Sequence, residues 1–308
     1  MIYRVLCIAP NPAIDRIEAV DRLVAGSVHR PQMLICQPGG KPFNVARAAH
    51  SLGRRALVIG VLAGYAGRWF ARAATREGID GRWTWVEGET RTCYAVLDRE
   101  TGRFSEFYEP GTPIEPPVWA ALAADLSRAL VSADVLVIAG SLPPGAPSDL
   151  AARWTAEANA AGVRVALDIS GESLRDALTQ RPWLVKINAA EAAGVTETAD
   201  PAAAAAVLHA AGAGTAIVTA GIKGSYLVSE GGRFRAVPPG EVGRFSIGSG
   251  DAFLAGFVTA AMRGASSEDS LRAAAAAGAA NALIPGPGRL DLTALGRLAD
   301  ATVIERLT

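Results

Sequence analysis

The chain has 308 residues, with 30 basic and 30 acidic side chains and a formal net charge of zero. Half of its residues are hydrophobic, which excludes a disordered chain and allows a full hydrophobic core. Without an excess of positive charge, the protein has no general attraction to nucleic acid or to an anionic membrane. We expect neither as a partner.

The three cysteines, Cys7, Cys36 and Cys93, are odd in number and widely spaced. This pattern fits neither a disulfide framework nor a paired-cysteine zinc motif. The first apolar run is interrupted at 10–12, unlike a signal peptide, and the uncharged stretch at 201–222 is too rich in Ala and Gly for a membrane span. We therefore expect a soluble, cytoplasmic protein.

Short apolar runs alternate with Ala-rich stretches along most of the chain. A continuous apolar run predicts a strand that is buried on both faces, as in a parallel sheet. The stretches between the runs, for example 148–161 and 201–212, predict the helices of βαβ units. We predict an α/β fold with a mainly parallel central sheet flanked by helices on both faces. The predicted strands are 5–9, 56–60, 135–140, 163–170, 183–188 and 215–221.

Three segments in the N-terminal third break this alternation: 16–20, 91–98 and 104–110. The turn-like sequence at 99–102 joins the last two into a hairpin. We predict a small antiparallel sheet that projects as a lid, with lid strands from about 12–37 and 88–111. Because we find no internal repeat and no long linker, we expect residues 1–308 to form a single domain that carries this lid.

Only three of the 30 basic residues are lysines, Lys41, Lys186 and Lys223. An ammonium group is a compact point charge, whereas a guanidinium is a wide planar fork, so a crowded polyphosphate site can favour lysine. Retention of three surface lysines by chance explains the composition equally well. The motifs around the lysines are needed to decide between these interpretations.

The first motif, at 38–53, pairs Gly39 and Gly40 with Lys41 and places Asn44 on the helix that follows. Paired glycines let a ligand approach the backbone, and the helix N-terminus, an ammonium and an amide can then bind its polar groups. On its own, the motif fits a tight turn with Pro42 opening a helix equally well.

The second motif, at 246–257, leads from Gly248, Ser249 and Gly250 into a helix that begins near Asp251. Successive backbone N–H groups at a helix start form an anion cradle that suits a transferring phosphoryl group. Beside such a cradle, Asp251 is a general base if a substrate hydroxyl reaches it, and otherwise an N-cap. The sequence contains no Walker A pattern.

Several segments, in this order along the chain, are similar to the PfkB (ribokinase-like) carbohydrate kinases, and within them to the 1-phosphofructokinase and tagatose-6-phosphate kinase branch. The resemblance covers nearly the whole chain and is specific because the segments occur together. They are APNPAID at 9–15, PGGKPFNVAR at 38–47, TR at 90–91, EPG at 109–111, GSLPPGAP at 140–147, LDISGESL at 167–174, VKINAAE at 185–191, TAGIKGS at 219–225 and IGSGDAFLAGF at 247–257.

On the acceptor side, the resemblance implies that Asp251 is the general base and that the N–H groups from Gly248 through Ser249 and Gly250 to Asp251 stabilise the transferring phosphate. The residues that it implies for the sugar hydroxyls are Asp15, Gly39, Gly40 and Asn44. For binding a phosphate that the substrate already carries, the resemblance implies Arg91, Lys41 and Ser141. Neither cation has an obvious carboxylate partner nearby in the sequence, so we expect Arg91 and Lys41 to converge on one phosphate.

On the nucleotide side, Lys186, Asn188 and Glu191 match the family's K-x-N-x-x-E pattern, which implies that Glu191 positions Mg²⁺ directly or through water. Thr219, Gly221 and Gly224 match the family's nucleotide loop. Asn281 falls where a late helix borders the adenine. The implied cofactors are ATP and Mg²⁺. Phe245 stands where ribokinase relatives have an aspartate associated with a monovalent cation, which argues against a K⁺ requirement.

The sequence also departs from the family's pattern. Pro42 and Ile187 replace a glycine and a proline, and Cys93 and Tyr108 replace two asparagines on the lid. The reaction class survives these changes because Asp251 and the glycines before it are present. The identity of the sugar does not follow, because the lid should cover it.

The resemblance thus implies an ATP-dependent kinase that transfers the γ-phosphate to a hydroxyl of a phosphorylated ketohexose: fructose 1-phosphate, fructose 6-phosphate or tagatose 6-phosphate. The alternatives are a kinase of an unphosphorylated sugar or nucleoside, against which Arg91 argues, and a non-catalytic sugar-binding relative, against which Asp251 argues. Cys93, Tyr94, Val96 and Phe107 of the lid are not expected all to find cover within one chain. We therefore expect a homodimer through the lid.

Overall fold

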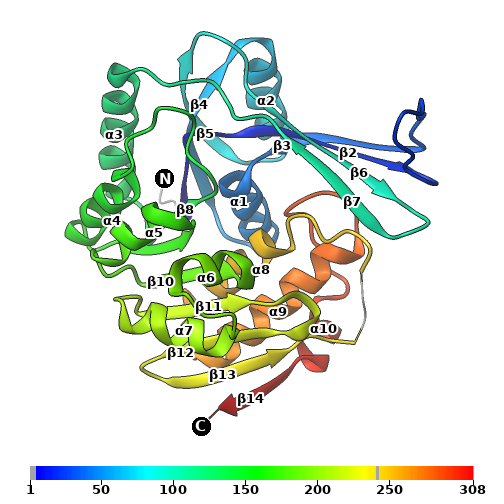
Figure 1. Cartoon of the computed structure of the whole chain (residues 1–308). Helices are drawn as coiled ribbons and strands as arrows, with labels where there is room; N and C mark the ends of the chain where they lie inside the picture. The colour runs from blue at the N-terminus through cyan, green and yellow to red at the C-terminus, as the bar shows by residue number, and fades with distance from the viewer. Residues whose placement is uncertain (1–4, 241–242, 308) are drawn as a thin grey trace.

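The computed structural model describes residues 5–240 and 243–307, which form two β-sheets and the helices around them (Figure 1). Within these residues the larger sheet has ten strands, in the order β14-β13-β12-β11-β10-β9-β8-β1-β4-β5. Neighbours from β11 to β5 are parallel, and β12 to β14 continue the sheet in antiparallel pairs. The strands are β1 (Val5–Ala9), β4 (Ala56–Ala63), β5 (Asp80–Val86), β8 (Val135–Ala139), β9 (Arg164–Asp168), β10 (Leu184–Asn188), β11 (Thr215–Thr219), β12 (Ser225–Ser229), β13 (Gly232–Val237) and β14 (Val303–Leu307).

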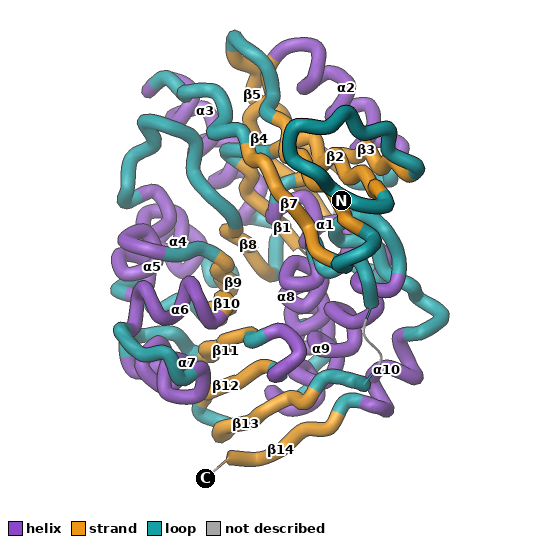
Figure 2. Tube along the Cα trace, turned by 45° about the vertical axis from the view of Figure 1, so that its right-hand side comes forward, coloured by secondary structure: helices purple, strands orange, loops and turns teal. Residues whose placement is uncertain are grey.

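Helices cover both faces of the larger sheet, which confirms the predicted α/β fold (Figures 1 and 2). Successive side chains of a strand point to opposite faces, and in β1 Val5 and Cys7 belong to one hydrophobic core while Leu6 and Ile8 belong to the other. The first core is covered by α1 (Lys41–Ser51), α2 (Gly64–Arg76), α8 (Ser249–Ala261), α9 (Ser267–Leu283) and α10 (Leu295–Ala301). The second is covered by α3 (Pro116–Leu130), α4 (Leu150–Ala160), α5 (Gly171–Leu178), α6 (Ala189–Thr196) and α7 (Pro201–Ala210).

The predicted small sheet is present, in the strand order β3-β2-β6-β7. Its strands are β2 (Ala13–Val20), β3 (Met33–Gly39), β6 (Thr92–Asp98) and β7 (Arg103–Tyr108). The hairpin β6–β7 is antiparallel as predicted. Strand β3, which was not itself predicted, pairs antiparallel with β2, whereas β2 and β6 are parallel. The reason is that β2 follows β1 and β6 follows β5, and β1 and β5 run in the same direction, so both lid strands leave the same edge of the larger sheet. Where they meet, the Ile14 N–H donates to the Arg91 carbonyl at 2.9 Å.

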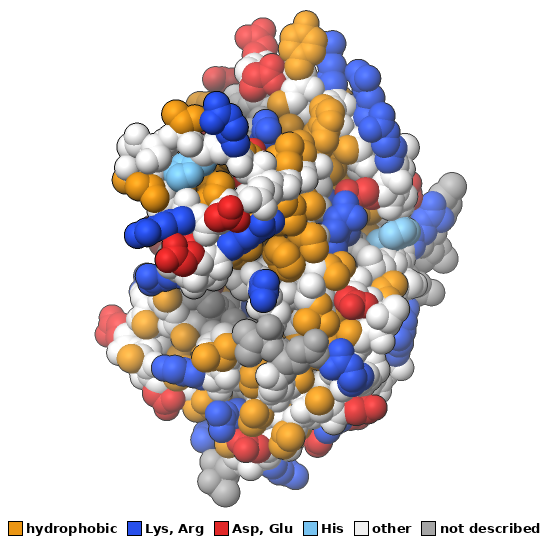
Figure 3. All heavy atoms as spheres, turned by 90° about the vertical axis from the view of Figure 1, so that its right-hand side faces the viewer, with side chains coloured by type: hydrophobic (Ala, Val, Ile, Leu, Met, Phe, Trp, Pro, Cys, Tyr) orange, Lys and Arg blue, Asp and Glu red, His pale blue; other side chains and the backbone are white. Residues whose placement is uncertain are grey.

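The small sheet extends away from the larger sheet (Figure 1). It also carries exposed hydrophobic side chains. Of the four apolar lid residues singled out in the sequence, Val96 is buried, Cys93 and Tyr94 are half-buried, and Phe107 is 61% exposed. Figure 3, which views the molecule from the side of this sheet, shows hydrophobic side chains gathered among charged ones. Among the described residues, no helix combines the length and the apolar character needed to cross a membrane.

Candidate active site

A cavity of about 700 Å³ opens at the carboxyl ends of the parallel strands and reaches the small sheet. This edge is where open α/β sheets bind ligands, because the loops that follow the strands can carry polar groups. Most of the predicted site residues line the cavity: Asp15, Gly40, Lys41, Asn44, Arg91, Ser141, Lys186, Asn188, Glu191, Thr219, Gly248, Gly250 and Asp251. The predicted residues that are not part of its wall are Gly39, Ser249, Gly221, Gly224 and Asn281.

Asp251 lies in the first turn of α8 and lines the cavity, although it is only 5% exposed. Asn44 of α1 donates to its Oδ2 at 2.9 Å. Burial raises the pKa of Asp251 to about 7, with a smaller contribution from the charge of Asp168. Lys41, Lys186 and the hydrogen bond from Asn44 oppose this rise. A carboxyl group with a pKa near 7 suits general-base catalysis at neutral pH.

The start of α8 requires glycine. Gly248 has φ +83°, and a Cβ at this position would lie 2.5 Å from the Cα of Pro287. The Ser249 N–H does not belong to the predicted anion cradle, because it donates to the Ser246 carbonyl at 3.1 Å. N–H groups in the first turn of a helix have no acceptor within the helix, so those of Gly250 and Asp251 can bind an anion.

Asp15 on β2 packs directly against Gly39, where a Cβ would lie 2.0 Å from one of its carboxylate oxygens. Gly40 follows with φ +85° and begins α1. Burial raises the pKa of Asp15 to about 6, and the charge of Arg47 together with hydrogen bonds from Asn44 and Gly40 limits the rise. The paired glycines therefore place a largely ionised carboxylate beside the start of α1, where it can accept hydrogen bonds from hydroxyl groups.

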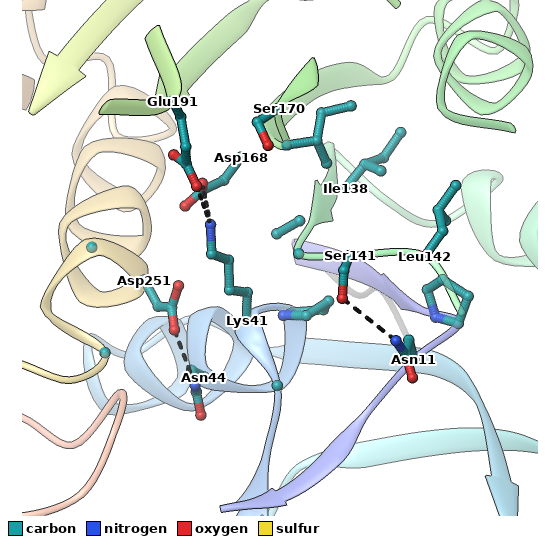
Figure 4. Close-up of a pocket in the computed structure, with 18 of the residues that line it drawn as sticks. Asn11, Lys41, Asn44, Ile138, Ser141, Leu142, Asp168, Ser170, Glu191 and Asp251 are labelled. Atoms are coloured by element: carbon teal, nitrogen blue, oxygen red, sulfur yellow. Dashed lines mark hydrogen bonds and ion pairs between the residues drawn. The ribbon is translucent and has the colours of Figure 1, made fainter. Parts of the chain in front are cut away.

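Lys41 does not lie where it was predicted. Its Nζ donates to Asp168 Oδ1 at 2.9 Å and to Glu191 Oε1 at 3.4 Å, and it points away from Ser141 (Figure 4). Burial alone would lower the pKa of Lys41, but Asp168, Asp251 and Glu191 outweigh burial and raise it. The three carboxylates around Lys41 come from distant parts of the chain, so no local pattern indicated them. The expected convergence of Lys41 with Arg91 on one substrate phosphate is not seen in this arrangement.

Asp168 at the end of β9 was given no role by the sequence, yet it binds two of the three lysines. It is fully buried, and Lys186 Nζ donates to its Oδ2 at 2.7 Å. Burial would raise the pKa of Asp168, but the charges of Lys186 and Lys41 lower it. Lys186 also lies beside the start of α8, since a Cβ at Gly250 would lie 2.9 Å from its Nζ. The pair thus holds an ammonium group next to the cradle.

Asn188 and Glu191 form a capping box at the start of α6. The Glu191 N–H donates to Asn188 Oδ1 at 2.9 Å, and the Asn188 N–H donates to Glu191 Oε2 at 3.0 Å. Part of the K-x-N-x-x-E pattern therefore serves the helix start. The other carboxylate oxygen of Glu191 faces Lys41 and the cavity (Figure 4).

Arg91 lies at the end of the cavity formed by the small sheet. Its Nε and Nη2 donate to the Asn11 carbonyl at 3.2 and 3.0 Å, and its Nη1 donates to the Glu109 carbonyl at 2.9 Å. A guanidinium has five N–H groups, so part of its donor set is left for a ligand. Asn11, which the sequence analysis missed, also donates from Nδ2 to Ser141 Oγ at 3.4 Å. Asn11 and Ser141 lie across the cavity from Asp251 (Figure 4).

The predicted nucleotide loop follows β11. Thr219 ends this strand and lines the cavity. Gly221 begins a short 3₁₀ turn, η1 (Gly221–Lys223). Gly224 has φ +101°, and a Cβ there would lie 2.3 Å from the Ala236 carbonyl oxygen, so only glycine fits. Lys223 is exposed and is not part of the cavity wall.

Asn281 of α9, which was predicted to lie beside an adenine, is fully buried, is not part of the cavity wall and hydrogen-bonds to the loop that precedes α8. Its Nδ2 donates to the Ile247 carbonyl at 3.3 Å, and its Oδ1 accepts from the Gly288 N–H at 3.0 Å. The amide thus connects the loop before the cradle to the segment around Pro287.

The family model described as pfkB family carbohydrate kinase matches residues 5–293. The chain belongs to this family. It is a sugar kinase, a phosphotransferase with an alcohol group as acceptor, and the resemblance seen in the sequence is confirmed. A 1-phosphofructokinase from Haemophilus influenzae is 30% identical over 281 residues, which are 89% of this chain and 90% of the relative. A 1-phosphofructokinase from Rhodobacter capsulatus is 32% identical over 282 residues, 90% of this chain and 89% of the relative.

Among solved structures, phosphofructokinase-2 from Escherichia coli in complex with potassium superposes with a TM-score of 0.88 at 25% identity. The match covers 97% of this chain and 99% of that chain. The two proteins therefore share their fold over nearly the whole chain.

Proposed function

We propose that this kinase transfers the γ-phosphate of ATP to a hydroxyl of a phosphorylated ketohexose, with Asp251 as the general base. The acceptor is fructose 1-phosphate, fructose 6-phosphate or tagatose 6-phosphate. The observation that carries the proposal is a buried carboxylate with a pKa of about 7 at the start of a glycine-rich helix, with two lysines facing it. The names of the relatives, 1-phosphofructokinase and phosphofructokinase-2, support the substrate class.

The sugar end of the cavity supplies the acceptors and donors that a polyol needs. Asp15 accepts from hydroxyl groups, and Asn44, which donates to Asp251, also lowers the pKa of Asp15. A hydroxyl bound here is within reach of Asp251, which takes its proton as the oxygen attacks the phosphorus. Arg91 and Ser141, across the cavity, bind the phosphate that the sugar already carries.

The phosphate being transferred carries charge that the protein must neutralise, because phosphoryl transfer depends on alignment and electrostatics rather than on a covalent intermediate. Lys41 and Lys186 supply two positive charges beside the start of α8. The N–H groups of Gly250 and Asp251 donate to the same oxygens. Asp168 keeps both ammonium groups in place.

ATP binds along Asn188, Thr219 and the 221–224 turn, at the carboxyl ends of β10 and β11. Among the described residues, no group of three or more His, Cys, Asp or Glu side chains forms a protein metal site. Mg²⁺ commonly takes one or two carboxylates together with phosphate oxygens and water, and Glu191 fits that requirement. Mg²⁺ held by Glu191 would neutralise negative charge on the phosphates of ATP. We propose no K⁺ site, because Phe245 occupies the position of the cation-associated aspartate.

One observation favours an unphosphorylated sugar as the acceptor. With Lys41 turned toward Asp168, Arg91 is the cation left at the substrate-phosphate end, and three of its N–H groups already donate to backbone carbonyls. A single partly used guanidinium binds a dianion less strongly than two converging cations. The free sugar therefore stays the second candidate.

Steady-state kinetics with ATP and Mg²⁺ on four acceptors tests the proposal: fructose 1-phosphate, fructose 6-phosphate, tagatose 6-phosphate and free fructose. We expect kcat/KM for one of the phosphorylated ketohexoses to exceed that for free fructose by at least about tenfold, the value of one charge-assisted contact. A preference for free fructose would replace the phosphosugar proposal with the second candidate. Absence of phosphate transfer to any acceptor would contradict both.

A further inference from the structure

Arg47 of α1 is a charged side chain inside the protein that the proposed mechanism does not use. It is 4% exposed and lies one helical turn after Asn44. Each of its five N–H groups has an acceptor. The acceptors are both carboxylate oxygens of Glu77, Asn44 Oδ1 at 3.0 Å, the Pro287 carbonyl at 2.8 Å and the Pro38 carbonyl.

The contact between Arg47 and Asn44 fixes which way the amide of Asn44 faces. A guanidinium only donates hydrogen bonds, so the atom of Asn44 that faces Arg47 must be the oxygen. The amide nitrogen is then on the opposite side, where it donates to Asp251 Oδ2 at 2.9 Å. The direction of both hydrogen bonds of the Asn44 amide therefore follows from the chemistry of Arg47, which can donate but not accept.

The geometry points to Arg47 as a positioning residue that holds the Asn44 amide in one orientation and so presents Asp251 as a hydrogen-bond acceptor. If the amide turned over, its oxygen would face the carboxylate of Asp251, and that contact needs a proton on Asp251. Arg47 thereby keeps the base in the form that can accept a proton. This inference rests on the proposed function of Asp251.

Arg47 is itself held from three directions. Its Nε donates to Glu77 at the end of α2 at 2.6 Å, and Glu77 also accepts from Arg289 at 3.4 Å. Its guanidinium lies 5.0 Å from the centre of the Phe43 ring. Lysine has one ammonium group in place of a planar fork, so it can keep the charge at position 47 but not this set of contacts.

The orientation of Asn44 has a consequence for the pH dependence of catalysis. The charged groups that act on Asp251 are Asp168 of β9, Lys41 of α1 and Lys186 of β10. None of them is a hydrogen-bond partner of Arg47. The hydrogen bond from Asn44 stabilises the ionised form of Asp251 and lowers its pKa. When the amide is free to turn over, this effect weakens, the pKa rises, and the acidic limb of the kcat profile moves to higher pH.

A double-mutant cycle on kcat tests the inference, with Arg47→Lys, Asn44→Ala and the double variant measured on the preferred acceptor. We expect Arg47→Lys to lower kcat by about 10- to 100-fold, with a smaller change in KM for ATP, and to move the acidic limb to higher pH. In the Asn44→Ala background the same change should lower kcat by less than about twofold, because the amide through which Arg47 acts is gone. An equal loss in both backgrounds, or an unchanged kcat in Arg47→Lys, would overturn the inference.

Arg289→Lys is the matched control, because Arg289 donates to Glu77 and Gln37 but not to Asn44. We expect it to leave kcat and the pH profile unchanged, and a loss equal to that of Arg47→Lys would count against a specific role of Arg47. If Arg47→Lys does not fold, Glu77→Gln replaces it in the cycle, and its smaller loss of kcat should likewise disappear with Asn44→Ala. Failure of the proposed function is recognised separately, by an Asp251→Asn variant that retains its turnover.

Discussion

The ammonium group of Lys186, in the middle of β10, lies 2.7 Å from the buried carboxylate of Asp168 at the end of the neighbouring strand β9. The Lys186 side chain is 5% exposed and that of Asp168 is not exposed at all. Removing one partner of a buried ion pair leaves an uncompensated charge in the interior. The two residues therefore contribute to the stability of the fold as well as to the charge of the cavity.

We expect Asp168→Asn to lower the free energy of unfolding by about 3–5 kcal/mol in urea denaturation at pH 7. The control is Asp149→Asn, which removes an exposed ion pair with Arg153 and should cost less than about 1 kcal/mol. The folded-state pKa of Asp168 is lowered, so this contribution is present above its unfolded pKa and lost as the pH falls toward the folded value. Equal effects of the two variants would contradict the role of the buried pair.

Because Gly248 lies close to Pro287, we expect an alanine at position 248 to destabilise the protein more than an alanine at a glycine in open space. Gly248 and Gly264 have φ +83° and +85°, but a Cβ at Gly248 would lie 2.5 Å from backbone, whereas a Cβ at Gly264 would meet nothing within 4 Å. Gly264→Ala should cost about 1 kcal/mol of backbone strain. Gly248→Ala should cost at least about 3 kcal/mol, since overpacking adds to the same strain. Similar losses in thermal or urea denaturation would show that the loop around Pro287 can move away.

Most of the main sheet could be predicted because strands that are buried on both faces have continuous apolar sequences. Strands β5, β12, β13 and β14 at its edges were not predicted, since none of them is buried along its whole length and β14 pairs from the far end of the chain. The parallel pairing of β2 with β6 was also missed. It depends on where both strands leave the main sheet, which no local pattern records.

The sequence predicted the parts of the site in which backbone conformation matters most, which are the glycines before Asp251 and before Lys41. The direction in which a long side chain points could not be predicted. Lys41, for example, contacts Asp168, which is 127 positions away in the sequence. A signal for Asp168 was available, because it is a charged residue that ends an otherwise apolar strand. Asn188 and Glu191 matched a nucleotide pattern that also encodes a capping box, so the sequence alone could not separate the two roles.

Arg91 is the cation that distinguishes a phosphosugar from a free sugar. We expect Arg91→Ala to raise KM for the phosphorylated acceptor about 10- to 100-fold, the value of a charge-assisted contact, with little change in KM for ATP. Arg91→Lys should restore part of the loss, because an ammonium cannot reproduce a fork. If Arg91→Ala affects phosphorylated and free acceptors equally in steady-state kinetics, Arg91 does not bind the substrate phosphate.

Exposed apolar side chains on the small sheet predict a homodimer. Leu34 and Phe107 are 53% and 61% exposed and lie on the same face of this sheet. We expect sedimentation at micromolar concentration to show a dimer and Phe107→Asp to convert it to a monomer, because a charge cannot be buried there without a partner. Tyr65→Asp, at an 82% exposed position on α2, is the control and should stay dimeric. A monomeric wild type would contradict the prediction.

The role of Asp251 makes a prediction about pH in the unmodified enzyme. Its pKa is raised to about 7 and the base must be ionised to accept a proton, so kcat/KM should rise with pH through about 7 and level off above it. The Asn variant should be at least as stable as the wild type at pH 8, since a raised carboxyl pKa means that burial disfavours the ionised group. A loss of activity in that variant then cannot be attributed to unfolding.

The turnover of Asp251→Asn with ATP, Mg²⁺ and the preferred acceptor tests the central claim most directly. We predict that kcat falls by about 10²–10⁴, the usual cost of a lost general base. KM for ATP and for the acceptor should change little, and the remaining activity should no longer rise with pH through about 7. A variant that keeps kcat within a few-fold of the wild type, with the same pH profile, would show that Asp251 is not the base.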